Sequence, residues 1–478
     1  MSADMHEFDV VIVGAGTAGS SLAEYVAHRG LSVALVDRKP RGEIGDKPCG
    51  DAIDPRHFET TGFKPPEPGD TVNRVKGIRV YPPNLKMFYT LTSVYGNGYV
   101  VDRHRDGQTR MKRAVKEGAV LFDNCLVKRL LLEDGFARGV RSLQIREEEG
   151  RKTKGDEVDI KARVTVDASG WQAVLYRDAP NGWGMDKAIG AGERVDSSRD
   201  IVELRNPQAD GAIPLEPDYL DIILTERFAP GCYVWRFPAH PEGRVVNVGN
   251  GVAVRPGAPK SRALLEEYYR FDALFEGCRR LKSATWPIPV RRPRGMLVGN
   301  GFAALGDAAI QIDPTWGEGI GYGIGAAWFL GQTVCEALEA GRNPSAESLW
   351  PYAWSYMTSP EYGLRQVRFD VFRLFLQSGT DRDFNGAMTY ALIREADLLG
   401  SVDADVKIGL LDRLRRGLVS AVTGQMSLLR RLRYVHNAMG RARALYEEYP
   451  DNPGEYPEWK ERESLFFRKV QSRLAPNS

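Results

Sequence analysis

The stretch EFDVVIVGAGTAGSSLAEYVAHRGLSVALVDRKP, residues 7–40, decides the fold, because it contains a strand, a glycine turn, a helix and a second strand. Residues 10–13 form a short apolar run typical of a buried strand, and residues 32–36 form another. Between them, residues 20–28 have helical character, and Gly30 follows where a glycine commonly ends a helix. This order predicts a βαβ unit and therefore a parallel sheet.

The turn after the first strand carries Gly14, Gly16 and Gly19 in the spacing Gly-x-Gly-x-x-Gly. The first glycine permits a tight turn, the second lets the backbone approach a pyrophosphate, and the third lets the helix pack on the strand. The helix N-terminus offers unpaired N–H groups to the phosphates. Asp37 closes the second strand, where a carboxylate can accept ribose hydroxyls. These features predict dinucleotide binding; the alternative is a glycine turn that binds nothing.

Length and composition are those of an ordinary globular protein. The chain has 478 residues, of which 42% are hydrophobic and 27% charged, and its formal net charge is +2. This length predicts two or three packed units, and the balanced charge gives no signal for nucleic acid. Five scattered cysteines without a CxxC pair predict free thiols in a reducing cytosol and no metal site. No secretory signal or spanning segment is visible, so we expect a cytoplasmic protein.

Changes in the hydrophobic pattern along the chain predict a discontinuous domain organisation. A nucleotide-binding domain is interrupted by segments with strand-like alternation, and helical patterns dominate the C-terminal part. The expected boundaries are 1–60, 101–180 and 295–345 for the nucleotide-binding domain, 61–100 and 181–294 for a substrate-binding β domain, and 346–478 for the helical region. The segment EVDIKARVTVDASG, residues 157–170, is expected to form a strand pair.

A second segment, GFAALGDAAIQIDPTWGEGIGYGI at residues 301–324, distinguishes FAD from NAD. It resembles the Gly-Asp segment of the flavoproteins that include the aromatic hydroxylases. The resemblance implies that Asp307 binds ribose or ribityl oxygens of FAD, and that the helix start at Gly319 and Ile320 faces the pyrimidine end of the flavin. A helix dipole aimed there stabilises an anionic reduced flavin. Taken alone, Asp307 has the alternative role of a helix cap.

Two shorter segments agree with this resemblance. VTVDASG, residues 164–170, is similar to a strand-turn segment of the same proteins, and Arg103 matches an arginine that lies near the cofactor in them. Three motifs in the expected order predict FAD. The predicted fold class is α/β, with a Rossmann-like FAD-binding domain of the aromatic-hydroxylase type, an inserted antiparallel-β substrate domain and a helical C-terminal region.

The loop GDKPCGDAI, residues 45–53, contains a candidate catalytic thiol. In such flavoproteins this loop passes close to the isoalloxazine ring. A thiol at Cys49 can donate a proton to a carbon next to one that has received a hydride. The alternative is that Cys49 is a small buried hydrophobe. Lys47 is interpreted as a solvated surface lysine.

The stretch PGCYVWRFP, residues 230–238, sets Tyr233, Trp235 and Phe237 at alternate positions, so one face of a strand carries all three aromatic rings. Alternation alone is compatible with an ordinary core. Beside the FAD motifs we predict instead the wall of a substrate pocket, with Trp235 touching the substrate and Cys232, Val234 and Arg236 pointing the other way.

The stretches Lys47-Pro48-Cys49-Gly50 and Pro230-x-x-Tyr233-x-Trp235-x-Phe237-Pro238 resemble those of the geranylgeranyl reductase family, in particular its archaeal digeranylgeranylglycerophospholipid reductases. The resemblance implies an FAD enzyme that saturates the C=C bonds of prenyl chains in membrane lipids. The FAD contacts that it implies are Ala18, Asp37, Cys49, Gly50, Arg103, Asp307, Gly319 and Ile320, with a backbone contact near Val127. Asp37 departs from the glutamate common in flavoproteins, which shortens the reach to the ribose.

This function implies hydride transfer from reduced flavin to one alkene carbon and protonation of the other. An unactivated alkene accepts hydride poorly, so a dry pocket with a placed acid is required, and Cys49 is the candidate. The chain has no second dinucleotide fingerprint. The electron donor is therefore expected to be a transiently bound NAD(P)H or a ferredoxin.

The C-terminal part suggests peripheral attachment to a membrane. Between Lys407 and Arg443, Asp412 is the one acid among nine basic residues: Lys407, Arg413, Arg415, Arg416, Arg430, Arg431, Arg433, Arg441 and Arg443. Apolar residues at helical spacing accompany them: Leu410, Leu411, Leu414, Leu418, Val422, Leu428, Leu429 and Leu432. A basic amphipathic surface on anionic headgroups fits this pattern. A helical bundle with a solvated basic face fits it equally.

Two other functions share this sequence pattern. A flavin-dependent monooxygenase or halogenase is one, because YVWRFP is related to the W-x-W-x-I-P stretch of halogenases. A non-catalytic prenyl-binding escort protein is the other, since GDP-dissociation inhibitors hold prenyl groups on a related fold. Oxygen consumption would favour the first, and a colourless protein the second.

Overall fold

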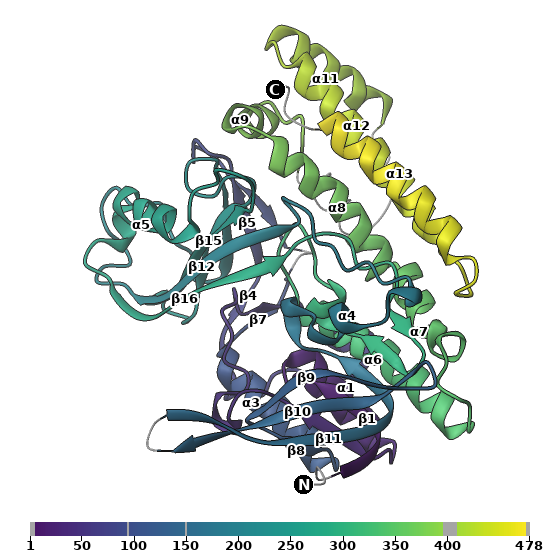
Figure 1. Ribbon diagram of the computed structural model, residues 1–478. Helices are drawn as coiled ribbons and strands as arrows, with labels where there is room; N and C mark the ends of the chain where they lie inside the picture. Colours follow the sequence, from purple (N-terminus) through teal and green to yellow (C-terminus); the bar gives the residue numbers. More distant parts are fainter. Residues whose placement is uncertain (1–4, 93–94, 149–150, 395–408, 475–478) are drawn as a thin grey trace.

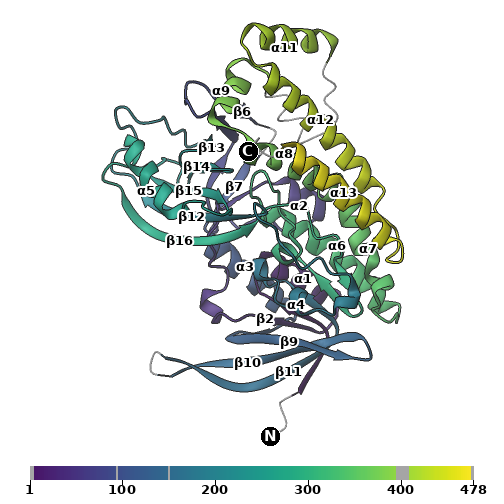
Figure 2. The same ribbon diagram turned by 45° about the horizontal axis from the view of Figure 1, so that its top comes forward.

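The computed structural model describes residues 5–92, 95–148, 151–394 and 409–474, so Lys407 of the basic C-terminal run lies outside the described residues. Two β layers lie one above the other, and a helical segment covers one side of both (Figure 1). The view in Figure 2 shows the same arrangement with the top of the molecule, where α11 lies, brought forward. The predicted α/β class is confirmed.

The lower layer is a mainly parallel sheet built around the N-terminal βαβ unit. Its described strands follow the order β17-β18-β11-β1-β2-β8, and β10 and β9 add an antiparallel extension to β11. The strands are β1 (Met5–Val13), β2 (Val33–Val36), β8 (Val120–Phe122), β9 (Cys125–Glu133), β10 (Phe136–Glu148), β11 (Arg151–Asp167), β17 (Val298–Gly299) and β18 (Phe302–Ala304).

The parallel strands end together at one edge of this sheet. Val13 of β1 is in register with Val36 of β2 and with Asp167 of β11, which is in register with Ala304 of β18. Segments that follow parallel strands meet at their carboxyl edge. The glycine turn, Asp37 and the Gly-Asp segment are therefore neighbours in space.

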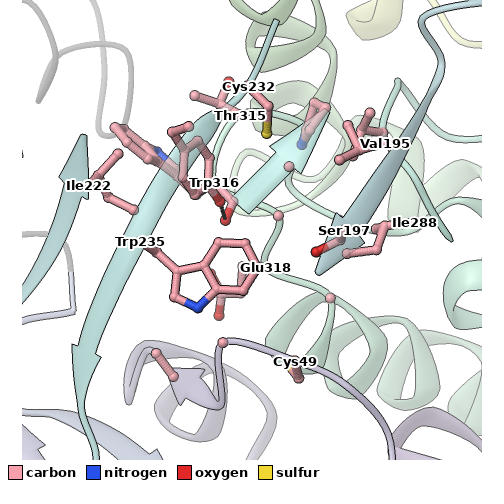
Figure 3. Close-up of a pocket in the computed structure, with 18 of the residues that line it drawn as sticks. Cys49, Val195, Ser197, Ile222, Cys232, Trp235, Ile288, Thr315, Trp316 and Glu318 are labelled. Carbon is pink, nitrogen blue, oxygen red and sulfur yellow. Dashed lines mark hydrogen bonds between the residues drawn. The ribbon is translucent and has the colours of Figure 1, made fainter. Parts of the chain in front are cut away.

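The upper layer is a seven-stranded sheet in the order β16-β12-β15-β14-β13-β5-β6, and a three-stranded sheet, β3-β7-β4, lies beside it. The strands of the larger sheet are β5 (Gly77–Tyr81), β6 (Tyr89–Leu91), β12 (Arg194–Glu203), β13 (Tyr219–Leu224), β14 (Tyr233–Pro238), β15 (Val245–Ala253) and β16 (Arg279–Pro289). Those of the smaller are β3 (Ala52–Ile53), β4 (Thr71–Val75) and β7 (Gly98–Val101). Figure 3 shows Trp235 of β14 lying toward the loop that carries Cys49.

Helices cover the lower sheet and form the C-terminal region. Among the described helices, α1 packs against α3 and α6, and α8 packs against α12 and α13. The helices are α1 (Thr17–His28), α2 (Arg56–Thr61), α3 (Arg103–Lys116), α4 (Val174–Asp178), α5 (Ser261–Phe271), α6 (Ile320–Glu339), α7 (Ala346–Thr358), α8 (Gly363–Ser378), α9 (Asp381–Thr389), α11 (Leu410–Val422), α12 (Met426–Glu447) and α13 (Tyr456–Leu474).

The helical region is tied to the core by a buried arginine. Arg292 forms ion pairs with Asp370 of α8, at 3.2 Å, and with Glu463 of α13. All three side chains are buried. Removing one member of such a group leaves an uncompensated buried charge, so the group fixes where the C-terminal helices sit.

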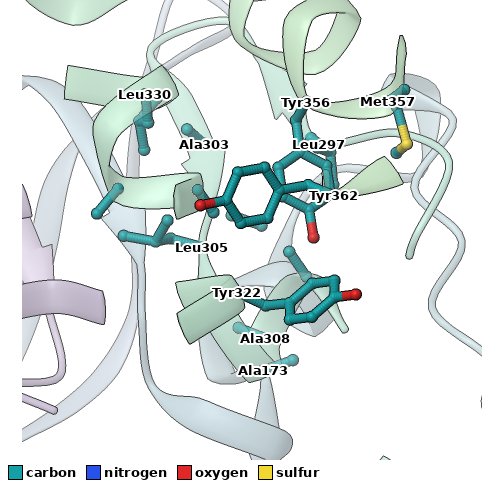
Figure 4. Close-up of a cluster of buried hydrophobic side chains, with 14 of the residues drawn as sticks. Ala173, Leu297, Ala303, Leu305, Ala308, Tyr322, Leu330, Tyr356, Met357 and Tyr362 are labelled. Carbon is teal, nitrogen blue, oxygen red and sulfur yellow. The ribbon is translucent and has the colours of Figure 1, made fainter. Parts of the chain in front are cut away.

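Glycines on α6 let bulky rings approach its backbone. A Cβ built on Gly321 would lie 1.9 Å from the His57 ring, and one built on Gly325 would lie 2.1 Å from the Tyr362 ring. Figure 4 shows Tyr362 with Tyr322 and Tyr356 in this buried cluster. The small-residue spacing of α6 therefore serves close aromatic packing.

Two expectations need adjustment. Residues 157–170 were expected to form a strand pair, but β11 runs unbroken to Asp167 and pairs with β10, which precedes it. The small sheet also joins β3, from the expected nucleotide segment 1–60, to β4 and β7 from about the segment 61–100. The domain boundaries themselves stay a prediction.

We expect Gly325→Ala to destabilise the protein by about 1–3 kcal/mol, because the new methyl group overlaps the Tyr362 ring. Gly440→Ala in α12 is the matched control, since nothing lies within 4 Å of its Cβ position. The control should stabilise by about 0.5–1 kcal/mol through helix propensity. Urea unfolding of both variants measures the difference, and equal effects would contradict the packing role.

Candidate functional site

A cleft of about 1710 Å³ follows the carboxyl edge of the parallel sheet. Its walls come from the glycine turn after β1, the loop after β2, the end of β11 and the segment after β18. The residues predicted to bind a cofactor that line it are Gly14, Gly16, Ala18, Asp37, Cys49, Gly50, Arg103, Val127, Asp307, Gly319 and Ile320. We call this space the cofactor cleft.

Gly19 does not line the cofactor cleft and has the packing role expected of the third glycine, so its place among the cofactor-binding residues stays a prediction. A Cβ on Gly19 would lie 1.9 Å from the Gly14 carbonyl oxygen, and one on Gly14 would lie 2.2 Å from the Ala168 carbonyl oxygen. Gly14 also has a φ of +111°, which side chains rarely adopt. Both glycines seat α1 against the strand ends.

The cleft has the features that a dinucleotide requires at its pyrophosphate. Nothing lies within 4 Å of the Cβ position of Gly16, so the backbone there is open to a ligand. Arg103 donates from Nη2 to the Thr17 hydroxyl at 2.6 Å, and its Nη1 lies 3.5 Å from Asp106. Its buried Nε and Nη1 have no hydrogen-bond partner among the described residues. A bare backbone beside a buried guanidinium fits a pyrophosphate.

Asp37 is held in place at the edge of the cleft. Its two carboxylate oxygens accept hydrogen bonds from the backbone N–H groups of Ala15 and Lys39, each at 2.8 Å. These bonds fix the carboxylate at the edge of the cleft and leave lone pairs for ligand hydroxyls.

Lys47 is not the solvated surface lysine that the sequence suggested. Its Nζ forms an ion pair with Asp307 at 2.5 Å, across the cofactor cleft. The Lys47 side chain is 38% exposed and that of Asp307 only 11%. The Lys-Pro-Cys-Gly loop is thereby joined to the Gly-Asp segment through side chains on opposite walls.

A second cleft of about 1130 Å³ adjoins the first and is enclosed by the upper sheet and the start of α6. We call it the substrate chamber. The aromatic strand contributes Tyr233, Trp235 and Phe237 to its lining, and their contact with a substrate stays a prediction. The two spaces meet at Pro48, Cys49, Gly50, Trp286, Ile288, Gly317, Gly319 and Ile320.

Each aromatic residue of β14 has a defined contact. The Tyr233 hydroxyl donates to the Trp316 carbonyl oxygen at 2.5 Å, and Trp235 Nε1 donates to Asn247 Oδ1 at 2.9 Å. Phe237 packs on Gly50, where a Cβ would lie 2.8 Å from the ring. The three rings are thus both core and chamber wall.

The opposite face of β14 agrees with expectation except at one residue. Val234 lies in a separate core cluster, and Arg236 forms ion pairs with Asp221 and Asp272. Cys232, however, lines the substrate chamber. It precedes the first residue of β14, so strand alternation does not extend to it.

Three polar residues of the chamber region were missed by sequence reasoning. Arg199 of β12 and Asn247 of β15 each donate to the Cys49 carbonyl oxygen, at 3.1 and 2.8 Å. Both also donate to Asp51 Oδ2, at 3.2 and 2.8 Å. Asp51 directly follows the Lys-Pro-Cys-Gly stretch, and this position could have marked it as a candidate site residue. Nothing in the sequence marks Arg199 or Asn247.

The two acidic groups of the loop differ in strength. Burial, with the Asp51 carboxylate nearby, raises the pKa of the Cys49 thiol above its usual value. Burial raises the pKa of Asp51 to about 6, although Arg199 and Arg103 oppose the shift. Asp51 is therefore a stronger acid than the thiol predicted to act as proton donor.

Behind Tyr233 lies a third, smaller space. It shares Tyr233, Thr315, Trp316 and Leu376 with the substrate chamber. Its remaining lining is apolar: Val80, Leu224, Phe372, Phe375, Phe384, Ala387, Met388 and Ile393. We call it the distal chamber.

The proteins whose sequences are similar to this chain have names of one kind. The family profile described as geranylgeranyl reductase catalytic domain matches residues 207–278. A digeranylgeranylglycerophospholipid reductase of Sulfolobus acidocaldarius is 29% identical over 456 residues, covering 95% of this chain and 96% of its own. Digeranylgeranylglycerophospholipid reductase 2 of Methanopyrus kandleri is 30% identical over 342 residues, covering 70% and 78%.

Solved structures share the fold. A geranylgeranyl bacteriochlorophyll reductase-like protein of Thermoplasma acidophilum superposes with a TM-score of 0.70 at 21% identity, covering 90% of this chain and 100% of that chain. A myxobacterial FAD-dependent chondrochloren halogenase gives a TM-score of 0.58 at 18% identity, covering 88% and 90%. From the sequence relatives, this chain belongs to the geranylgeranyl reductase family.

Proposed function

We propose that this chain is an FAD-dependent reductase that saturates C=C bonds of geranylgeranyl chains in membrane lipid precursors. The observation that carries the proposal is the meeting of two spaces at Cys49 and Gly50. One has the open glycine turn that a dinucleotide requires, and the other is lined mainly by aromatic and aliphatic side chains. The names of the sequence relatives support the same substrate class.

The residues of the cofactor cleft fit FAD. Gly16, Ala18 and Arg103 would hold the pyrophosphate, Asp37 the ribose and Asp307 the ribityl chain. Gly319 and Ile320 would lie against the pyrimidine end, and the backbone near Val127 would add a further contact. When bound and reduced, FAD supplies a hydride, and with it two electrons, to one alkene carbon.

The protein supplies a dry, shaped chamber. Trp235 and Phe237 keep water from the alkene, and the loop of Cys49 and Gly50 sets how closely the chain approaches the cofactor cleft. Water exclusion matters because protonation must be directed to one carbon of an unactivated alkene.

The rival functions gain no support. Halogenases with a similar fold match this chain at 14% and 18% identity, which shows the fold alone. A non-catalytic escort protein does not need to bind a dinucleotide. This chain nevertheless has an open backbone at Gly16 and a buried guanidinium at Arg103 beside it. We propose NAD(P)H or a ferredoxin as the electron donor.

We expect the purified protein to bind FAD and, when reduced without oxygen, to add two mass units per double bond to a geranylgeranyl glycerophospholipid. Gly16→Val projects a side chain into the open cradle, so it should lower FAD retention while the melting temperature of the apoprotein stays near wild type. Flavin absorbance and lipid mass spectrometry measure both effects. Reduced flavin with unchanged lipid mass would refute the function.

The distal chamber supports a long chain as substrate. A geranylgeranyl group that lies along Trp235 needs apolar space for its far end, and the distal chamber adjoins the substrate chamber at Tyr233 and Trp316. Its lining is apolar apart from Thr315, so it favours an alkyl chain over a polar head group.

Ala387→Phe should fill part of the distal chamber, to which Ala387 contributes wall. Displacing about two methylene groups costs about 1.6 kcal/mol, so kcat/KM for a geranylgeranyl lipid should fall by about tenfold. A geranyl lipid, too short to reach this space, should react as in wild type and serves as the internal control. Equal losses for both lipids would contradict the assignment.

We propose that α11 attaches the protein to the membrane surface. Five of its apolar side chains are highly exposed: Leu410 at 73%, Leu411 at 83%, Leu414 at 62%, Leu418 at 69% and Val422 at 80%. No helix within the described residues is long and apolar enough to cross a membrane. The amphipathic pattern instead suits a helix that lies in the headgroup layer.

The charges around α11 favour an anionic bilayer. From residue 413 to residue 446 the sequence contains no Asp or Glu, and Arg430 and Arg433 are exposed. The basic count of the sequence overstates the available charge, however. Arg415 and Arg416 pair with Asp412, and Arg431 pairs with Asp383.

The two interpretations of the C-terminal part apply to different helices. The α11 face is exposed, whereas Leu428 and Leu429 of α12 are buried and α12 packs on α8. The amphipathic surface is thus confined to α11, and α12 belongs to the helical bundle.

The double variant Leu411→Asp/Leu418→Asp should bind vesicles of phosphatidylglycerol and phosphatidylcholine at least about tenfold more weakly than wild type. Each substitution removes a leucine side chain that would be buried in the membrane. Leu465→Asp on α13 is the matched control, as Leu465 is 47% exposed on another helix. Vesicle flotation measures binding. Equal flotation of both variants would refute α11 as the attachment site.

A further inference from the structure

We propose that Asp51, rather than Cys49, is the acid that protonates the alkene in the substrate chamber. The inference rests on the proposed reductase function and names the group that completes its chemistry. Asp51 lines the substrate chamber and not the cofactor cleft. It therefore lies on the substrate side of the loop that carries Cys49.

The carboxyl group of Asp51 is placed by its backbone. Asp51 has a φ of +65°, in the left-handed region that residues other than glycine seldom adopt, and it is 5% exposed. Strained backbone of this kind persists only where surrounding contacts hold it. Here it turns the side chain into the chamber directly after Gly50.

Two donors from the upper sheet hold one oxygen of this carboxyl group. Oδ2 accepts hydrogen bonds from Arg199 Nη2 and Asn247 Nδ2. The buried Oδ1 has no hydrogen-bond partner among the described residues. A buried oxygen without a hydrogen-bond partner is costly as part of a charged carboxylate, so this environment favours the protonated form of Asp51.

The aromatic strand takes part in this arrangement. Trp235 Nε1 donates to Asn247 Oδ1, which orients the Asn247 amide so that its Nδ2 points at Asp51 and at the Cys49 carbonyl oxygen. Trp235 is therefore a positioning residue for the acid as well as part of the wall.

The charges facing Asp51 come from several elements. Arg199 of β12 and Arg103 of α3 lower its pKa, as does the Asn247 hydrogen bond, whereas burial and Asp102 raise it. Burial is the largest of these effects, and the pKa is about 6. An acid with a pKa near neutrality combines a useful protonated fraction with adequate strength.

The proton step balances as follows. The π electrons of the alkene form a C–H bond with the Asp51 proton while the O–H bond breaks. The other alkene carbon receives the hydride that reduced FAD supplies under the proposed function. Asp51 remains as a carboxylate paired with Arg199, and a solvent proton restores the acid before the next turnover.

Asp51→Asn tests this role, because asparagine tolerates a positive φ and keeps an acceptor for Arg199. We expect the single-turnover rate of lipid reduction to fall by at least about 100-fold, the scale of general acid catalysis. Cys49→Ala should lower the rate by less than about tenfold. The wild-type rate should decline as the pH rises above about 6, because the protonated form is required; Cys49→Ala should keep that profile and Asp51→Asn should lose it.

A second readout does not depend on activity. The Asp51 carboxylate raises the pKa of the Cys49 thiol, so Asp51→Asn should lower that pKa and speed alkylation of Cys49 by iodoacetamide near neutral pH. Peptide mass spectrometry follows Cys49 alone. An unchanged alkylation profile in a folded variant would overturn the placement of the carboxyl group.

Asp54→Asn is the matched control, because Asp54 is a buried carboxylate close in sequence that pairs with Arg56 and lines neither chamber. It should leave both the pH profile and Cys49 alkylation as in wild type. Wild-type rates in Asp51→Asn would refute this inference while leaving the reductase function intact. Absence of lipid reduction by the wild-type holoenzyme would instead refute the function.

Discussion

The close seating of α1 on the ends of β1 and β11 is the constraint on which the site depends. Gly19 meets the Gly14 carbonyl oxygen and Gly14 meets the Ala168 carbonyl oxygen at distances that no Cβ permits. Because α1 begins there, its unpaired N–H groups face the carboxyl edge of the parallel strands. Every other part of the cofactor cleft is arranged around that edge.

The Lys-Pro-Cys-Gly loop joins the two β layers at the place where the two clefts meet. Below, Lys47 pairs with Asp307 of the lower layer. Above, Arg199 and Asn247 of the upper sheet donate to the Cys49 carbonyl oxygen and to the Asp51 carboxylate of the same loop. The loop that separates cofactor from substrate is thus held from both sides, which suits a reaction between two bound molecules.

The C-terminal helices have different structural roles. α8 and α13 are fixed to the core through Arg292, and α8 and α9 supply much of the distal chamber. α11 presents its leucines outward instead. Under the proposed attachment, α11 would bring a membrane-embedded chain close to the helices that line the distal chamber.

The sequence alone determined the βαβ unit, the dinucleotide motif, the Gly-Asp segment and the aromatic strand, because each depends on residues close together in the chain and on local periodicity. The tertiary structure alone decided the Lys47–Asp307 pair, the chamber position of Cys232 and the hold on Asp51. Those contacts join residues 260 positions apart for Lys47 and Asp307, and 148 and 196 apart for Asp51 with Arg199 and Asn247. Spacing in one sequence carries no information about which distant strands become neighbours, so the contacts that hold the assigned acid were visible only once the sheets were packed.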